Sequence, residues 1–176
     1  MISQATKKAF LSELKYYAKR EFRFLKDRKN HPAVYPVHQF LLEHGQFFNH
    51  QPLPKGIRKG RAPLCFMYAG RLADQNPSEH FYAEGRACKI NQDGGVDLIA
   101  THAWAVDRQG NVIDRQPAWQ DGGIYFGVPF KYKFYQNALG KCGLWASLLE
   151  NVPQEILDKP SLEFKASITQ RPSIQR

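Results

Sequence analysis

The sequence has few cysteines, and they do not follow the spacing typical of metal sites. Its three cysteines, Cys65, Cys88 and Cys142, lie far apart and form no Cys-x-x-Cys pair. This odd, scattered set does not indicate a disulfide framework and argues against structural zinc. The histidines show no His-Glu-x-x-His spacing. We therefore expect neither a bound metal nor another cofactor.

Long apolar runs are also absent. Residues 1–8 lack the apolar stretch of a signal peptide, and no later segment is long enough to span a bilayer. These absences predict a soluble, cytoplasmic protein kept in a reducing compartment. A hydrophobic content of 43% and an aromatic content of 13% favour a folded core over disorder.

Positive charge is abundant and unevenly placed. The net charge is +9, and residues 1–30 hold nine Lys and Arg against three acidic residues. A second basic patch consists of Lys55, Arg58, Lys59 and Arg61. Such surfaces attract nucleic acid or an acidic protein. A solvated basic face is the simpler interpretation, because no zinc finger, RNP-type motif or helix-turn-helix accompanies the charge.

Hydrophobic periodicity predicts helices first and strands later. Three- and four-residue spacing predicts helices over 4–28, 35–48 and 63–73. From residue 79 the period becomes two, which predicts strands up to a turn at 91–95, then over 96–106 and from 112 onward. Residues 124–130 form an aromatic segment with two breakers, followed by short helices over 131–139 and 143–150, split at Gly140. This order predicts an α+β fold.

We expect one globular unit built of three segments. Residues 1–50 form a basic helical segment packed on the core, 51–158 form the α+β core, and 159–176 form a polar tail.

The second predicted turn fixes which side chains share a face of the sheet. A five-residue loop over 107–111 places Val106 opposite Val112. Continuing this pairing places His102 on the same face as Asp114, as diagonal neighbours about 7–8 Å apart between Cα atoms. An imidazole and a carboxylate at that separation can form a hydrogen bond.

Cys65 supplies the third member of a possible catalytic arrangement. It lies in the first turn of the third predicted helix, where the helix dipole stabilises a thiolate. His102 can exchange its proton, and Asp114 can hold the imidazole in one orientation. Each residue alone also has an ordinary structural interpretation, because cysteine is among the most buried residue types. Together they predict a cysteine nucleophile for acyl transfer.

These residues resemble the core of the transglutaminase-like, papain-related superfamily. The similar motifs are Cys65 on a helix, Tyr82-Ala83-Glu84-Gly85, His102-Ala103-Trp104 and Val112-Ile113-Asp114. The resemblance covers roughly residues 60–130, and the ending at 125–130 is similar to small, uncharacterised phage and bacterial proteins with this core. It implies a papain-like core with a nucleophile-bearing helix packed on an antiparallel sheet. It also implies amide or ester hydrolysis, deamidation or transamidation of a protein or peptide-like substrate.

Other residues are expected to support this site. Trp104 is predicted to pack beside His102 and shield it from water, while Glu84 and Tyr82 are candidates for positioning the site or its substrate. The pattern places no glutamine to complete an oxyanion hole, although the Cys65 amide can supply one donor. The alternative is a non-catalytic, phage-type binding or inhibitor protein that uses its basic surface to bind nucleic acid or an acidic host protein.

Overall fold

A computed structural model describes residues 2–26, 36–61, 64–91, 95–116, 123–142, 146–151 and 164–168. The helices are α1 (Gln4–Lys26), α2 (Val37–His44), α3 (Cys65–Gln75), α4 (Tyr132–Cys142) and α5 (Leu148–Asn151). The strands are β1 (Gln46–Phe48), β2 (His80–Ile90), β3 (Val96–Asp107), β4 (Val112–Ile113) and β5 (Ile124–Pro129). The predicted α+β class is confirmed.

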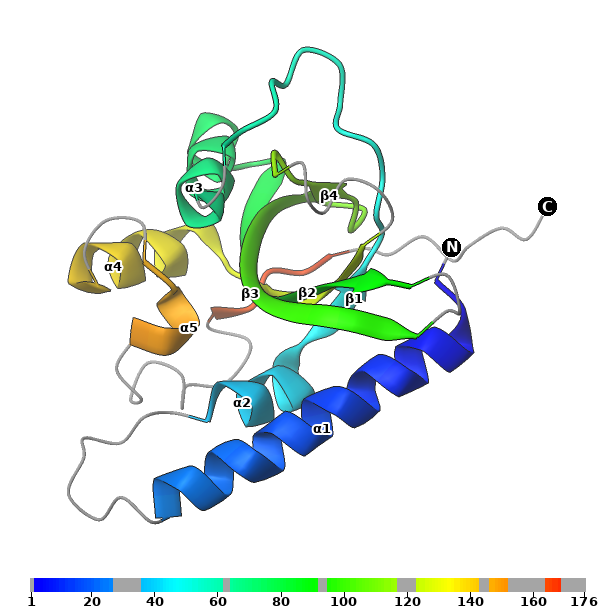
Figure 1. Ribbon diagram of the computed structural model, residues 1–176. Coiled ribbons are helices and arrows are strands. Elements are labelled where there is room, and N and C mark those ends of the chain that lie inside the picture. The colour runs from blue at the N-terminus through cyan, green and yellow to red at the C-terminus, as the bar shows by residue number, and fades with distance from the viewer. Residues whose placement is uncertain are drawn as a thin grey trace.

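The strands form one antiparallel sheet in the order β1-β5-β2-β3-β4. The sheet is strongly curled, and the helices lie outside the curl (Figure 1). The long hairpin of β2 and β3 forms its centre, and β5 returns to pair with the other edge of β2. The sheet therefore has an outer face toward the helices and an inner face within the curl.

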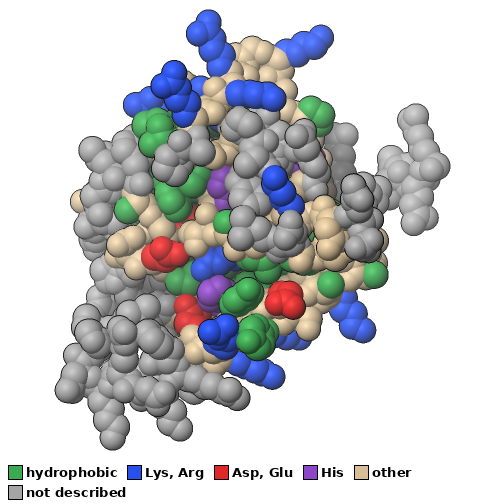
Figure 2. All heavy atoms as spheres, in the orientation of Figure 1, with side chains coloured by type: hydrophobic (Ala, Val, Ile, Leu, Met, Phe, Trp, Pro, Cys, Tyr) green, Lys and Arg blue, Asp and Glu red, His purple; other side chains and the backbone are tan. Residues whose placement is uncertain are grey.

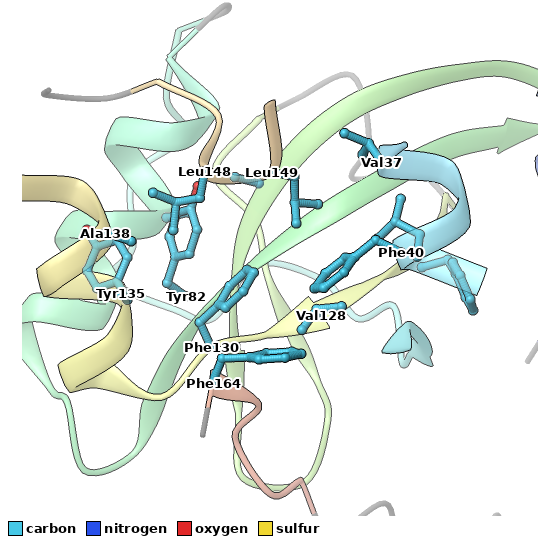
Figure 3. Close-up of a cluster of buried hydrophobic side chains, with 14 of the residues drawn as sticks. Val37, Phe40, Tyr82, Val128, Phe130, Tyr135, Ala138, Leu148, Leu149 and Phe164 are labelled. Carbon is cyan, nitrogen blue, oxygen red and sulfur yellow. The ribbon is translucent and has the colours of Figure 1, made fainter. Parts of the chain in front are cut away.

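Each face of the sheet has its own apolar core. The outer face packs on side chains from the helices, among them Phe10, Leu14, Phe40, Ala69, Tyr135 and Leu148. Figure 3 shows part of this cluster, in which Tyr82 faces Tyr135 and Phe130 faces Phe164. The inner face holds Phe48, Ala83, Ala87, Trp104, Val106, Val112 and Tyr125. Because both faces are buried, the strands carry few of the exposed polar positions typical of a half-buried sheet.

Two glycines allow the central strands to approach closely. Gly85 on β2 pairs with Gly127 on β5. A Cβ atom built on Gly127 would collide with the Glu84 carbonyl oxygen and lie 2.8 Å from the Trp104 ring. The indole thus packs directly onto the backbone of β5, which a larger residue at this position would prevent.

Two sequence predictions about element boundaries are wrong. The second helix was expected to run through Phe48, but it ends at His44, and Gln46–Phe48 form β1 on the edge of β5. Pairing with a strand some 80 residues away is not visible in local periodicity. The expected break at Gly140 is also wrong, because α4 continues to Cys142 and tolerates the glycine.

The other predicted elements agree only in part. The strand expected from residue 112 ends at Ile113, and α5 begins at Leu148, so residues 146–147 of the helix expected over 143–150 are not helical. Phe164, in the expected polar tail, is buried in the core. The first helix, the third helix and the strands around the turn at 107–111 are confirmed. The expected helix ending at 27–28, the centre of the turn at 92–94 and most of the expected tail lie outside the described residues. Among the described residues, no helix is both long and apolar enough to cross a membrane.

The packing at Gly127 predicts opposite effects for two similar substitutions. Gly127→Ala should lower the free energy of unfolding by roughly 1–3 kcal/mol, because its methyl group meets backbone and indole atoms. Gly140→Ala should raise it by about 0.5–1 kcal/mol, because a Cβ there meets no atom within 4 Å and alanine favours the helix. Urea denaturation of both variants measures the difference, and equal effects would contradict the packing described.

Candidate active site

Three separate elements carry the predicted catalytic residues. Cys65 is the first residue of α3, and His102 lies on the inner face of β3. Asp114 directly follows β4, whose pairing of Val106 with Val112 is the register expected from the sequence. The structure brings these three residues together.

The edge of β3 explains how Cys65 on an outer helix reaches His102 on the inner face. In the described chain, β4 pairs with β3 only at Ala105 and Val106, so β3 is not paired on this side at His102. The segment after β4 instead turns toward the start of α3. The thiol, imidazole and carboxylate therefore meet where this edge of β3 is not paired with β4.

His102 contacts both of the other residues. Its Nε2 atom lies 2.8 Å from Asp114 Oδ2, and its side chain also forms a hydrogen bond with Cys65. Burial alone lowers the pKa of His102, but hydrogen bonds and negative charge from Asp114 and Cys65 raise it to about 9. This environment favours an imidazolium at neutral pH.

Asp114 is held by two further donors. The Tyr125 hydroxyl donates to Oδ2 at 2.8 Å, and the backbone N–H of Gln116 donates to Oδ1 at 2.9 Å. Burial, together with the charge of Asp114, raises the pKa of Tyr125 well above its ordinary value of 10.0, so the phenol stays a donor. The carboxylate is thus fixed in orientation from three directions.

Trp104 lies beside the imidazole, as the sequence suggested. Its ring stacks near His102 with centroids 6.1 Å apart, and it meets Tyr125 edge-on at 5.2 Å. Trp104 is fully buried. It forms an apolar wall that limits water contact with the imidazole on this side.

Glu84 and Tyr82 lie on the outer face of the sheet, away from the imidazole. Glu84 accepts hydrogen bonds from Tyr82, Ser147 and the backbone N–H groups of Leu148 and Leu149. Burial raises the pKa of Glu84, and these donors oppose that shift. Glu84 therefore caps the short helix α5 rather than orienting His102. Tyr82 lies close enough to Cys65 for the thiol's charge to contribute, after burial and Glu84, to its raised pKa.

Sequence reasoning missed Gln116, which is buried at the start of α3. With its carbonyl oxygen facing the helix, Gln116 accepts from the backbone N–H groups of Leu64 and Cys65, each at 3.2 Å. The backbone N–H of Gln116 donates to Asp114 Oδ1. This one residue therefore connects the carboxylate with the helix that carries the thiol. No local pattern predicts the position of the Gln116 side chain, because an irregular segment has no periodicity that shows which way its side chains point.

The basic patch is on the loop that leads into α3. Lys55, Arg58, Lys59 and Arg61 are all exposed, and none forms an ion pair within the part of the chain that the structure describes. Figure 2 shows Lys and Arg side chains at the top of the molecule, where Figure 1 places this loop. The α1 helix runs along the opposite end, so the two basic regions do not form one surface (Figure 1).

The described residues contain no group of three His, Cys, Asp or Glu side chains that could hold a metal ion. No protein-family model, curated protein or solved structure matches this chain. Its function must therefore be inferred from the geometry of the site.

The contacts of His102 predict its titration. NMR titration of the ring should give a pKa near 9 in the native protein and a lower pKa in Asp114→Asn, which removes the main stabilising charge. Glu79→Gln removes the same charge from an exposed position and should leave this pKa unchanged. A native value near 6.5 would rule out the described pairing.

The same pairing should make stability depend on pH. The folded pKa of about 9 exceeds the ordinary value of 6.5, so the stabilisation is complete below about pH 6.5 and disappears as pH rises through 9. The loss attributable to His102 is roughly 3 kcal/mol and should be absent in His102→Gln. Urea denaturation at a series of pH values measures it.

The position of Gln116 predicts a role in holding α3. Gln116→Ala removes the side-chain acceptor of the Cys65 N–H, while the Leu64 N–H keeps the Arg61 carbonyl at 3.3 Å, and should lower the free energy of unfolding by about 0.5–2 kcal/mol. Gln109→Ala, in the exposed turn, should change it by less than about 0.5 kcal/mol. Equal stability of the two variants in urea would show that Gln116 does not cap the helix.

Proposed function

We propose that this protein is a cysteine-dependent acyl-transfer enzyme with a papain-like, transglutaminase-like core. The observation that carries the proposal is that His102 interacts with both Asp114, 2.8 Å from its Nε2 atom, and the Cys65 side chain. The position of Cys65 at the start of α3 adds to this, because a helix N-terminus and an imidazolium both stabilise a thiolate. Nucleophile, proton carrier and orienting carboxylate are the three roles such chemistry requires.

In the first half of the reaction, the Cys65 thiolate attacks the carbonyl carbon of an amide or ester. A carbon–sulfur bond forms, and the carbonyl π pair moves onto oxygen. When the tetrahedral intermediate collapses, the bond to the leaving amine or alcohol breaks, and the leaving group takes the proton from His102. The acyl group remains on Cys65 as a thioester, and Asp114 holds the now neutral imidazole in place.

In the second half, His102 accepts a proton from an incoming water or amine. The oxygen or nitrogen of that molecule attacks the thioester, and the carbon–sulfur bond breaks to restore the thiolate and imidazolium. Water gives hydrolysis or deamidation, whereas an amine gives transamidation.

Gln116 adds a condition to this mechanism. The Cys65 backbone N–H is a donor available to a carbonyl bound to Sγ, and Gln116, with its side-chain oxygen facing the helix, accepts from it. The substrate oxygen must therefore replace the Gln116 carbonyl as acceptor before the N–H can stabilise the oxyanion.

The second candidate is a binding protein without catalysis. The observation in its favour is the exposed basic patch, which forms no ion pair among the described residues. This second candidate explains less of the structure, because a binding surface on the loop does not require a cysteine, a histidine and an aspartate buried next to one another.

Reaction with p-nitrophenyl acetate tests the proposal. We expect a burst of p-nitrophenolate and an acetyl group on Cys65, detected by mass spectrometry. Cys65→Ala and His102→Gln should reduce the burst rate by at least about 10³-fold. Cys88→Ala changes a cysteine buried in the core and should keep the burst. An undiminished burst in Cys65→Ala would refute the proposal.

A further inference from the structure

The chain around Cys65 has an unusual charge pattern. Between Glu43 and Asp74 the sequence contains no acidic residue, yet it contains five Lys and Arg, namely the four of the basic patch and Arg71. All five are exposed. This segment of the chain therefore presents basic side chains and no acidic side chain of its own beside Cys65.

The loop that carries the basic patch is fastened to the active site. Gly60 donates its N–H to the Arg115 carbonyl at 2.6 Å, and Arg115 Nε donates to the Arg58 carbonyl at 2.7 Å. The Arg115 guanidinium also lies 4.3 Å from the centroid of the Tyr68 ring. Arg115 lies between Asp114 and Gln116, so the loop is attached to the same segment that orients His102.

Apolar contacts hold the other half of the loop. Leu53 and Ile57 pack against Leu72 on α3 and against Ala105 and Ile113 of the sheet. The backbone of the basic patch is therefore anchored on both α3 and the sheet, while its side chains face solvent. Charges held in fixed places select a ligand better than charges on a free chain, because less ordering is needed on binding.

We propose that this loop binds acidic side chains of a peptide substrate next to the acyl group that Cys65 attacks. Arg58, Lys59 and Arg61 supply the charge, and the exposed Leu64 beside Cys65 offers an apolar contact for the peptide. This inference rests on the proposed function.

An acidic peptide fits the site better than nucleic acid. A thiolate acyl transfer needs a carbonyl carbon, which a peptide supplies and a phosphodiester backbone does not. Single-stranded nucleic acid is usually bound by exposed aromatic rings beside the cations. Among the described residues, the large exposed hydrophobic side chains are Tyr16 and Tyr17 on α1 and Leu64, so the loop offers no such ring.

Alkylation of Cys65 by peptide chloromethyl ketones tests the inference. Probes with Glu-Glu-Ala and Gln-Gln-Ala sequences carry the same reactive group and differ only in charge. We expect the acidic probe to react faster with the full-length protein by on the order of tenfold at low ionic strength. This ratio should fall toward one as salt is added, because the interacting charges are exposed.

Two matched variants separate the loop from the protein's overall charge. The triple change Arg58→Gln, Lys59→Gln and Arg61→Gln should bring the ratio of rates near one. The loop should keep its fold in this variant, because Arg58 and Arg61 hold it through backbone atoms and not through their side chains. The triple change Lys8→Gln, Lys15→Gln and Lys19→Gln removes the same charge from exposed positions on α1 and should keep the ratio.

Three outcomes would overturn the inference. Equal rates for both probes, with Cys65 alkylated, would reject the acidic substrate and leave the proposed function standing. No alkylation of Cys65 by either probe or by iodoacetamide would reject both. Stronger protection of Cys65 by a single-stranded oligonucleotide than by an acidic peptide of equal charge would assign the loop to nucleic acid instead.

Discussion

The buried carboxylate of Asp114 is the contact on which the arrangement of the site depends. It accepts from His102, Tyr125 and the Gln116 backbone, and so joins β3, β5 and the segment after β4. A buried charge is costly unless donors surround it, so these groups must stay in position for the fold to tolerate it. The same donors that compensate for burial also fix the imidazole toward Cys65. Stability and chemical orientation thus depend on one set of hydrogen bonds.

The curled sheet makes this burial possible. On a flat sheet with one solvated face, a histidine and an aspartate on the side away from the helices would face water. Here the sheet is curled (Figure 1), and Trp104, Tyr125 and Phe48 form a buried cluster on its inner face. Their rings lower the local polarity and strengthen the interaction between His102 and Asp114. The close pairing of β2 with β5 at their glycines gives the indole the room it needs.

Much of the site could be predicted because its key spacing is local. The turn at 107–111 is marked by Asp107, whose carboxylate accepts from Gln109 and Asn111, and by Gly110 with φ of 82°. Such a turn sets the hairpin register, and the register places His102 and Asp114 on one face. The partners from distant segments could not be predicted this way. Tyr125 belongs to β5, which the local sequence indicated only as an aromatic segment. Gln116 lies in an irregular segment without hydrophobic periodicity. The contacts of Glu84 could not be predicted for the same reason, since its partners at the start of α5 lie more than 60 residues away.

The three consecutive residues 114–116 each attach to a different part of the molecule. Asp114 binds the imidazole, Arg115 binds the loop before α3, and Gln116 binds the start of that helix. Their alternating directions are set by the two-residue strand before them and hence by the length of the exposed turn at 107–111. Exposed turns usually accept insertions and deletions in evolution. Adding or removing one residue in this turn would reverse all three attachments together, so its length is constrained as tightly as the identity of a buried residue.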